Sequence, residues 1–241
     1  MVRNPFSAPV YYLPSTGSTM IDARKHVQGG SFCNGTVYWA GEQTAGCGRL
    51  PGRIWVAHPG CALLFTVILK KTGWQQGVAP SLLAACGVTA ALSANKLKNM
   101  LAIKWPNDIY LNGKKIAGIL TEAVGSELLL VGIGINVLSA PENTVLRNPA
   151  GFLAESCSPP PLAELLSLVL GGLHWSFSRT PREIHSYIAP LLLYQDQPVS
   201  ILMPDNTKAV GRLTGVGLRG EAVVHTGDRV ISVACGEMYA W

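Results

Sequence analysis

The stretch from residue 101 to residue 137 limits most strongly how this chain can fold. It contains four apolar segments with strand character, at residues 101–105, 109–111, 115–122 and 128–137. The Asn112-Gly113 dipeptide between the second and third segments is a strong signal for a tight hairpin turn. A further turn at residues 125–127 leads into the last segment. The pattern predicts a meander of strands.

The segments on either side of this meander predict a mixed α+β protein with two parts. Strands are expected at residues 10–13, 36–40 and 62–69, and helices at 20–25, 78–97, 162–177 and 182–193. After residue 196 the pattern changes to short β segments at 199–203, 209–216, 222–225 and 230–234. We therefore predict a main domain at 1–195 and a small β-barrel-like domain at 196–241, which is too small to be very stable unless it docks on the first.

The composition describes a compact globular protein, because 48% of the residues are hydrophobic and only 14% are charged. The net charge of +5 is scattered along the chain, which indicates a mild preference for anionic ligands and no nucleic-acid partner. The longest apolar run, at 61–69, is too short to span a membrane, and the N-terminus lacks the apolar core of a secretory signal. We expect a cytoplasmic protein without a membrane partner.

The six cysteines include no C-x-x-C pair, and no histidine stands at metal-ligand spacing. In a reducing compartment this pattern favours small buried thiols over disulfides or a zinc site.

Residues 41–55, GEQTAGCGRLPGRIW, are too rich in glycine to form a regular element and join two predicted strands. We call this segment the glycine loop. Its Arg49 and Arg53 carry guanidinium groups whose planar fork suits phosphate oxygens. The loop is therefore either a cover that holds an anion or an ordinary solvated loop, and its own residues do not separate these readings.

Lys104 is unusual because it lies inside a predicted strand, where an unpaired ammonium is costly to bury. It must meet either a ligand anion or a protein carboxylate such as Asp108 or Glu122. Glycines inside strands often mark the close approach of a ligand, and three stand near Lys104 in the predicted sheet. These glycines are Gly118, Gly132 and Gly134. Together they predict a slot for a flat or slender apolar molecule.

Ser18 and Thr19 precede a predicted helix, so their hydroxyls either cap it or bind a polar part of a small ligand.

Four motifs in the same order now resemble those of biotin protein ligases of the monofunctional type. They are Gly46-Cys47-Gly48-Arg49 with Gly52-Arg53-Ile54-Trp55, Lys104-Trp105-Pro106-Asn107-Asp108-Ile109, Lys115-Ile116-Ala117-Gly118-Ile119-Leu120 and Gly132-Ile133-Gly134-Ile135-Asn136-Val137. The resemblance implies the biotin–lipoate ligase fold, which is like that of class II aminoacyl-tRNA synthetases. That fold has a mixed, mostly antiparallel sheet flanked by helices, with a small C-terminal SH3-like β-barrel.

The resemblance also implies a reaction with two steps. Biotin reacts with ATP, assisted by Mg²⁺, to give biotinyl-5′-AMP, and a lysine of a biotin carboxyl carrier domain then takes the biotinyl group. Lys104 and Arg49 would be catalytic. Biotin would be bound by Ser18, Thr19, Gln43, Gly46, Cys47, Gly48, Arg49, Lys104, Gly118, Gly132 and Gly134. ATP and the adenylate would be bound by Arg49, Arg53, Trp55, Asn107, Lys115 and Asn136. No metal ligands are assigned, and a homodimer is left open.

The chain departs from the family pattern at four places. Cys47 replaces the first arginine of a Gly-Arg-Gly-Arg loop, Pro51 resembles an insertion, and Met20 stands where asparagine is common. The arginine often found shortly after a motif like Gly236-Glu237-Met238 is absent.

Three other functions compete with this one. A lipoate ligase or an octanoyltransferase shares the related fold, and Cys47 would be the nucleophile of the latter. A bifunctional repressor needs a helix-turn-helix domain, for which the ten or so residues before the first strand leave no room. A ligand-binding relative without catalysis is the third, because Cys47 alters the loop.

Overall fold

The structure is a computed structural model that describes residues 1–30, 32–71, 77–93, 97–141 and 149–240. Its helices are α1 (Thr19–Gln28), α2 (Pro80–Leu92), α3 (Leu162–Phe177) and α4 (Pro181–Ile188), with short 3₁₀ turns η2 (Lys98–Met100), η4 (Leu153–Glu155) and η5 (Ala189–Leu191). Its strands are β1 (Val10–Leu13), β2 (Thr36–Ala40), β3 (Ala62–Lys70), β4 (Leu101–Lys104), β5 (Asp108–Leu111), β6 (Lys114–Val124), β7 (Leu128–Asn136), β8 (Pro198–Leu202), β9 (Lys208–Val216), β10 (Ala222–Thr226), β11 (Arg229–Val233) and β12 (Glu237–Ala240).

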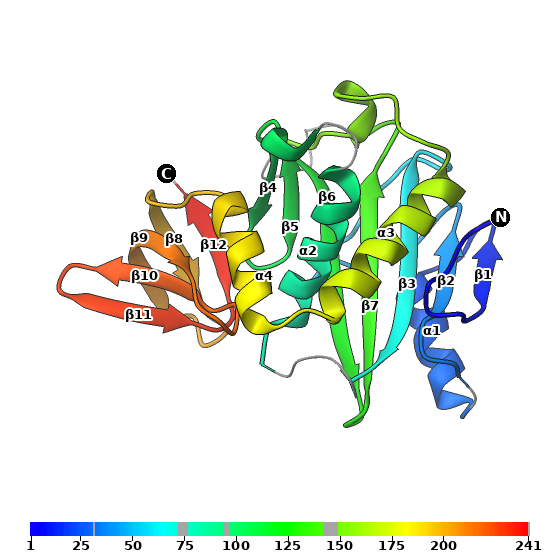
Figure 1. The fold of residues 1–241 in the computed structure, drawn as a ribbon, viewed down its shortest axis with the longest axis horizontal. Coiled ribbons are helices and arrows are strands. Elements are labelled where there is room, and N and C mark those ends of the chain that lie inside the picture. Colours follow the sequence, from blue (N-terminus) through cyan, green and yellow to red (C-terminus); the bar gives the residue numbers. More distant parts are fainter. Residues whose placement is uncertain (31, 72–76, 94–96, 142–148, 241) are drawn as a thin grey trace.

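A seven-stranded sheet forms the centre of the molecule (Figure 1), with the strand order β1-β2-β3-β7-β6-β5-β4. Only β1 and β2 pair in parallel, and all the other neighbours are antiparallel. Helices α2 and α3 cover one face, and α1 packs against β2, β3 and β7 on the other. The predicted α+β class with a mixed, mostly antiparallel sheet is confirmed.

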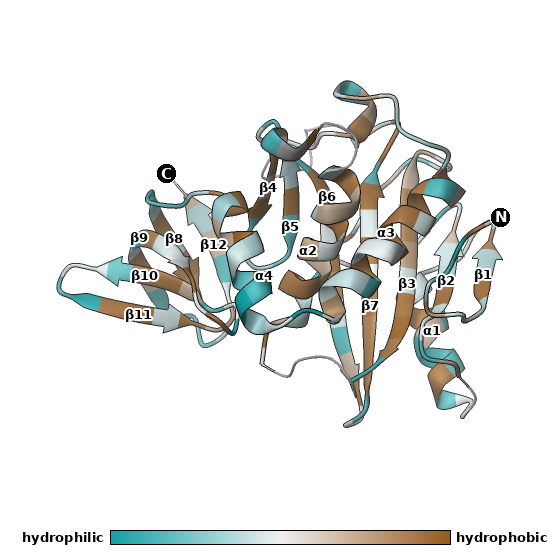
Figure 2. Cartoon of the chain, viewed as in Figure 1, coloured by the Kyte–Doolittle hydropathy of each residue, from teal (hydrophilic) through white to brown (hydrophobic). Residues whose placement is uncertain are grey.

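The two faces of the sheet have different surroundings, because side chains alternate along each strand. On β3, Phe65 and Val67 join the large core under α2 and α3, whereas Ile68 joins a small cluster with Met20 and Ala23 of α1. The central strands are hydrophobic along most of their length (Figure 2). The face that carries α1 therefore has less apolar cover, which leaves room there for a cavity.

The meander of strands at 101–137 is confirmed. Asn112 and Gly113 adopt φ angles of 50° and 76°, as a tight turn between two antiparallel strands requires.

Helix α2 runs from Pro80 to Leu92, within the predicted range of 78–97, and residues 94–96 of that prediction lie outside the described part of the chain. The last predicted helix is shorter than expected. Helix α4 ends at Ile188 instead of residue 193 and continues as a 3₁₀ turn that contains Pro190, which has no N–H to donate to a helical ladder.

The last five strands form a second antiparallel sheet with the order β11-β10-β9-β8-β12. It contacts the part of the chain that forms the seven-stranded sheet and its helices: the Nε1–H of Trp105 donates to the carbonyl of Gly220, and the N–H of Ala79 donates to the carbonyl of Arg219, both at 2.9 Å. Within the described residues this sheet is open between β11 and β12, so a closed SH3-like barrel is not confirmed.

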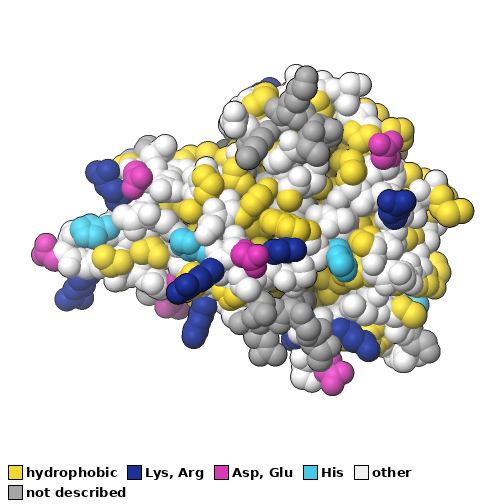
Figure 3. Space-filling view, in the orientation of Figure 1, with side chains coloured by type: hydrophobic (Ala, Val, Ile, Leu, Met, Phe, Trp, Pro, Cys, Tyr) yellow, Lys and Arg dark blue, Asp and Glu magenta, His cyan; other side chains and the backbone are white. Residues whose placement is uncertain are grey.

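The prediction of buried cysteines is wrong for most of them. Cys86 is buried, but Cys33, Cys47 and Cys235 are exposed, and none of the six cysteines forms a disulfide. Among the described helices, none has both the length and the apolar character needed to cross a membrane. On the face shown in Figure 3, lysine and arginine side chains are dispersed and do not gather in one basic patch.

Candidate active site

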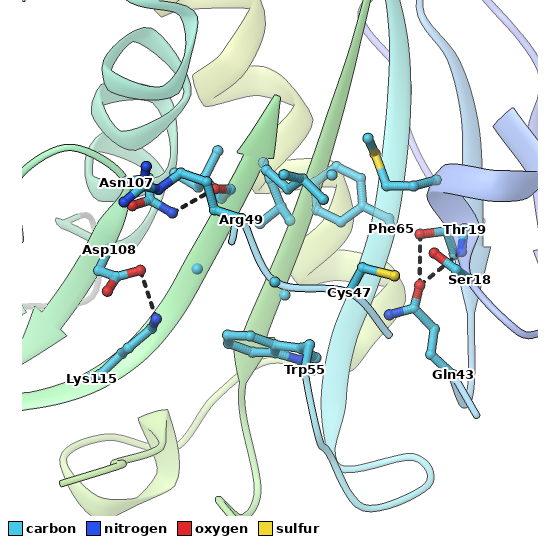
Figure 4. A pocket seen from close by; sticks show the side chains of 18 residues that line it. Ser18, Thr19, Gln43, Cys47, Arg49, Trp55, Phe65, Asn107, Asp108 and Lys115 are labelled. Atoms are coloured by element: carbon cyan, nitrogen blue, oxygen red, sulfur yellow. Dashed lines mark hydrogen bonds and ion pairs between the residues drawn. The ribbon is translucent and has the colours of Figure 1, made fainter. Parts of the chain in front are cut away.

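A cavity lies on the α1 face of the sheet, between the glycine loop and strands β6 and β7 (Figure 4). Its lining comes from α1, the glycine loop, β3, the start of β5, β6 and β7. The lining residues are Ser18, Thr19, Met20, Gln43, Cys47, Gly48, Arg49, Trp55, Phe65, Asn107, Asp108, Lys115, Gly118, Ile119, Leu120, Gly132, Ile133 and Gly134. Most of the predicted site residues are thus brought together from four separate stretches of sequence.

The glycine loop joins β2 to β3 as predicted, and its middle part folds into a small hairpin of its own. The N–H of Trp55 donates to the carbonyl of Gly46 at 2.9 Å, and the N–H of Gly48 donates to the carbonyl of Arg53 at 2.8 Å. Gly52 turns the chain with a φ of 75°. These bonds place Cys47, Gly48, Arg49 and Trp55 over the cavity.

The C-terminal sheet holds this hairpin from outside. Nη2 of Arg49 donates to the carbonyl of Gly236 at 2.9 Å, and Arg53 forms an ion pair with Glu237. Burial lowers the pKa of Arg53, but the hydrogen bond and the negative charge of Glu237 outweigh it, so the pKa is raised. Arg49 lines the cavity, whereas Arg53 lies outside the lining and faces β12. The two loop arginines therefore have different surroundings.

The indole of Trp55 fills the space that the strand glycines leave. A Cβ atom on Gly134 would lie 2.5 Å from Cε2 of Trp55, and one on Gly118 would lie 2.8 Å from Cζ3. A Cβ on Gly132 would instead lie 2.8 Å from the sulfur of Met20. Gly118 and Gly134 thus form the predicted slot, and a side chain of the loop lies in it. Gly132 makes room for Met20.

One end of the cavity is polar and built around Gln43 (Figure 4). The Oε1 atom of Gln43 accepts hydrogen bonds from the backbone N–H of Thr19 at 2.7 Å and from its hydroxyl at 3.0 Å. The hydroxyl of Thr19 also lies 2.8 Å from that of Thr66. Because Oε1 is taken, the Nε2 group of Gln43 is left to face the cavity.

Ser18 occupies the N-cap position of α1, which begins at Thr19, but of its two predicted roles the capping hydrogen bond is not formed. Gln43 satisfies the first N–H of the helix in its place, because its amide oxygen reaches across from the glycine loop. Ser18 is buried and lines the cavity, and its hydroxyl has no hydrogen-bond partner among the described residues.

The opposite end of the cavity is charged. Nζ of Lys115 lies 2.6 Å from the carboxylate of Asp108 and 5.8 Å from the centroid of the Trp55 ring. Asn107 lies beside them and donates from Nδ2 to the carbonyl of Ile119 at 2.9 Å, which ties the start of β5 to β6. A ligand that fills the cavity would therefore have a polar group at each end and an apolar middle.

Lys104 is buried beside this charged end but does not line the cavity. Neither carboxylate proposed as its partner is free, because Asp108 pairs with Lys115 and Glu122 with Arg24. Lys104 forms no ion pair within the described residues. Burial lowers the pKa of its ammonium, and the negative charge of nearby Asp108 offsets only part of this effect.

Asn136 is also buried outside the lining. Its Nδ2 donates to the carbonyl of Gly151, and its Oδ1 has no partner among the described residues.

Comparison with known proteins decides the family. The model of the biotin/lipoate A/B protein ligase family matches residues 12–137, just over half of the 241-residue chain. This chain belongs to that family.

Two relatives with a similar sequence are biotin–[acetyl-CoA-carboxylase] ligases. The one from Mycobacterium tuberculosis is 28% identical over 92% of this chain and 85% of its own. The one from Paracoccus denitrificans is 39% identical over 61% of this chain and 60% of its own.

The fold of the whole chain resembles that of a solved family member. A biotin protein ligase from Aquifex aeolicus, in complex with biotin and ATP, superimposes with a TM-score of 0.83 at 25% identity. The match covers 97% of this chain and 99% of that one, so it includes the C-terminal sheet.

Several residues that line the cavity of the present chain were not predicted as site residues. They are Met20, Phe65, Asp108, Ile119, Leu120 and Ile133. Met20 could have been predicted as a site residue, because it departs from the family pattern next to Ser18 and Thr19. Asp108 was considered only as a partner of Lys104. The others lie in strands that are apolar on both faces, so no alternation in the sequence shows which side chains face the cavity. Gly46, Arg53, Lys104 and Asn136 were predicted site residues and lie outside the lining.

Proposed function

We propose that this chain is an ATP-dependent biotin–protein ligase, which activates biotin to biotinyl-5′-AMP and transfers it to a lysine of a biotin carboxyl carrier domain. The observation that carries the proposal is the cavity itself. It has unpaired polar groups at one end, a glycine slot beneath an aromatic ring in the middle and, at the other end, charged side chains that include Lys115 paired with Asp108. Biotin has the matching sequence of groups: a ureido ring, an apolar ring and tail, and a carboxylate.

The polar end fits the ureido group. The Nε2 group of Gln43 is a donor for the ureido oxygen, and the hydroxyl of Ser18 can donate or accept. Thr19 acts through Gln43, whose amide it orients by two hydrogen bonds. A site that leaves such buried groups unpaired discriminates strongly against a ring that cannot bond to them. This favours biotin over lipoate, whose dithiolane ring has no hydrogen-bonding group of this kind.

The slot fits the rings of biotin once Trp55 moves away from Gly134. In the present conformation the indole lies where a flat ligand would contact the strand backbone. We propose that the indole and the ligand ring stack in the bound state, with Cys47 and Gly48 of the hairpin above them. Gly46 supports this hairpin through its carbonyl, and Gly132 acts indirectly by giving Met20 its place.

The charged end fits the first chemical step. A carboxylate oxygen of biotin forms a bond to the α-phosphorus of ATP, and the bond from that phosphorus to the pyrophosphate oxygen breaks. Two anions must come together for this step, so cations held in a partly buried site lower its barrier. We assign that role to Lys104 and Arg49, and we assign contacts with the nucleotide to Lys115, Asn107 and Arg53.

In the second step the amine of the acceptor lysine attacks the carbonyl carbon of the adenylate. An amide bond forms, the bond from that carbon to the phosphate oxygen breaks, AMP leaves, and the amine loses a proton to solvent. Water must be kept from the same carbon until the acceptor arrives, which we assign to the closed glycine loop. Trp55 would cover the adenylate in this state.

Mg²⁺ would assist the first step by neutralising phosphate charge. The described residues contain no group of three or more His, Cys, Asp or Glu side chains that could hold a metal. Such an ion is commonly held by substrate phosphates with one or two protein oxygens, and the unpartnered Oδ1 of Asn136 is an oxygen of this kind.

We also propose the domain boundary at residue 195, an SH3-like arrangement of the C-terminal strands, and a cytoplasmic location without a nucleic-acid partner. The homodimer stays an open prediction.

The test of the proposed function is transfer of biotin to a purified biotin carboxyl carrier domain, followed by mass spectrometry of the acceptor. We expect one added biotinyl group that requires both ATP and biotin, and no transfer when the acceptor lysine is replaced by arginine. Parallel reactions with lipoate and with an octanoyl thioester serve as controls. Transfer of either acyl group without transfer of biotin would overturn the proposal.

A further inference from the structure

Tyr110 is a large buried side chain near Lys104 that the proposed chemistry does not use. It lies on β5, is 2% exposed, and belongs to neither of the two hydrophobic clusters of the molecule. Its position is set by register: Ala102 of β4 faces Tyr110 of β5, and Lys104 faces Asp108. Residues two apart on a strand share a face, so Tyr110 and Lys104 are diagonal neighbours on the side of the sheet that carries the cavity.

The ammonium of Lys104 lies over the ring of Tyr110, with Nζ 6.0 Å from the ring centroid. An aromatic face attracts a cation, and the attraction is stronger when the pair is desolvated than at an exposed site. Lys104 is only 8% exposed and has no ion pair within the described residues. The ring of Tyr110 is thus a direct stabilising contact for a charge that water reaches poorly.

The hydroxyl of Tyr110 contributes nothing comparable. It is buried and has no hydrogen-bond partner within the part of the chain that the structure describes. Burial raises the pKa of this phenol, helped by the negative charge of Asp108, so the hydroxyl stays neutral. A buried hydroxyl without a partner costs free energy, and its removal is expected to be neutral or stabilising. The contribution of Tyr110 to this site is therefore its ring.

We infer that Tyr110 is a positioning residue for Lys104. The ring of Tyr110 holds the ammonium of Lys104 protonated and aimed toward the charged end of the cavity. The inference rests on the proposed function for its link to catalysis, although the contact itself does not. Other charged groups act on the same ammonium: Asp108 and Glu237 favour the protonated form, and Lys115 and Arg53 disfavour it. Tyr194 lies near Tyr110 and also disfavours ionisation of its hydroxyl.

The expected direction of the pH effect follows from these contacts. Burial lowers the pKa of Lys104, and the aromatic ring offsets part of that effect because it stabilises the charged form. Loss of the ring lowers this pKa further. The protonated and active form is then lost at a lower pH, and the alkaline limb of the pH profile moves toward neutral pH. A substitution that only loosened packing would lower activity without moving that limb.

The test compares Tyr110→Phe, which keeps the ring, with Tyr110→Leu, which removes it. The titration of Lys104 is followed by NMR in the full chain labelled with ¹³C-lysine, with a Lys104→Arg variant to assign the signal. We expect the Phe variant to titrate like the wild type. In the Leu variant we expect the midpoint to fall by about 0.4 to 1.5 pH units, the range between the strength of an exposed and of a desolvated cation–π contact.

Activity is measured on the same variants as pyrophosphate release with biotin and ATP between pH 6 and about 10, a range that spans ordinary lysine titration. We expect a roughly two- to thirtyfold lower kcat and a displaced alkaline limb for Tyr110→Leu, and little change for Tyr110→Phe. Tyr38→Leu is the matched control, because Tyr38 is a partly buried tyrosine of the same sheet that bonds to His26 instead. If Tyr110→Leu does not fold, Tyr110→Met replaces it.

An unchanged Lys104 midpoint in the Leu variant would overturn the inference, as would an equal change in the Phe variant. The NMR result needs no substrate. A wild-type protein that releases no pyrophosphate therefore contradicts the proposed function alone, and the two failures can be told apart.

Discussion

The two walls of the cavity are held in place by different kinds of contact. The sheet wall is part of the meander of β4, β5, β6 and β7; its strands β6 and β7 pair with strands on both sides, and β7 is buried along its whole length. The loop wall is a hairpin at residues 46–55 that contains exposed Cys47 and Ile54 and is attached to the C-terminal sheet by Arg49 and Arg53. The first wall is preformed by the core, whereas the second depends on a few contacts with another part of the chain.

This difference has a consequence for function. The sheet wall supplies the parts of the site that must not move, such as the slot and the buried cation. The loop wall supplies the parts that must open for substrates and close over the adenylate. Substitutions in the sheet wall should therefore affect mainly whether the reaction occurs. Substitutions in the loop wall should affect mainly how well its intermediate is retained, and those of Arg49 should also slow adenylate formation.

The largest effect is expected for Lys104→Ala, which removes the buried cation of the sheet wall. We expect adenylate formation to fall by at least about a hundredfold, the typical cost of losing one electrostatic contact to developing charge. Stability should not suffer comparably, because Lys104 has no ion pair to lose among the described residues. Pyrophosphate release and thermal unfolding measure the two effects. Lys104→Met, which keeps much of the volume, is the matched variant, and retained pyrophosphate release in both would refute the catalytic role of Lys104.

The sequence predicted the sheet wall well, for physical reasons. The apolar segments at 101–137, the Asn112-Gly113 turn and the strand glycines are local signals, and each corresponds to a feature of the structure. The order of strands followed from the short connections of a meander. The sequence could not show that Asp108 pairs with Lys115 in place of Lys104, because a choice between two lysines depends on side-chain geometry.

The loop wall was predicted less completely. Its glycines and arginines predicted a surface loop and left open whether it covers an anion, and the structure confirms the loop and its place over the cavity. The contacts of Arg49 with Gly236 and of Arg53 with Glu237 join residues more than 180 positions apart, and no local pattern carries that information. The same holds for Gln43, which satisfies the end of α1 from another segment of the chain.

The second-largest effect is expected where the two walls meet, at Gly134. In Gly134→Ala the new Cβ would lie 2.5 Å from the indole of Trp55, so either the ring or the strand must shift. Overpacking of this kind costs about 1–3 kcal/mol, which corresponds to a roughly tenfold to hundredfold weaker binding of biotin. Isothermal titration calorimetry measures it.

Two further variants separate the causes of that effect. Gly171→Ala is the matched control, because a Cβ at this position of α3 meets no atom within 4 Å. The double variant Gly134→Ala with Trp55→Ala removes the indole from the slot. If biotin binding recovers in the double variant, the collision is with Trp55, and if it does not, the collision is with the ligand itself. Unchanged binding in Gly134→Ala would contradict the assignment of the slot.

A smaller effect is expected for Arg49→Gly, which removes one tie between the loop wall and the C-terminal sheet. A hydrogen bond from a charged donor contributes about 1.5–3 kcal/mol. Partial exposure lowers that value, so we expect the adenylate to dissociate roughly tenfold faster. Rapid filtration of enzyme loaded with radiolabelled biotin measures this rate. Arg212→Gly is the control, since Arg212 also donates to a carbonyl but lies on β9, away from the cavity. An unchanged off-rate would show that the loop closes without Arg49.

The smallest effect is expected for Cys47→Ser, which tests whether the loop wall takes part in bond formation. A catalytic thiol needs a neighbouring base or a cationic setting that stabilises the thiolate. Cys47 is exposed, and its sulfur makes one long contact, 3.4 Å from the carbonyl oxygen of Ala45. No histidine contacts it within the described residues. We therefore expect kcat and the KM for biotin to change less than about twofold, well below the loss typical of a missing covalent nucleophile.

The assay for Cys47→Ser is transfer of biotin to the carrier domain, run beside transfer from an octanoyl thioester. Loss of octanoyl transfer in Cys47→Ser, with that activity present in the wild type, would make the loop wall the reactive one and reverse the roles assigned to the two walls.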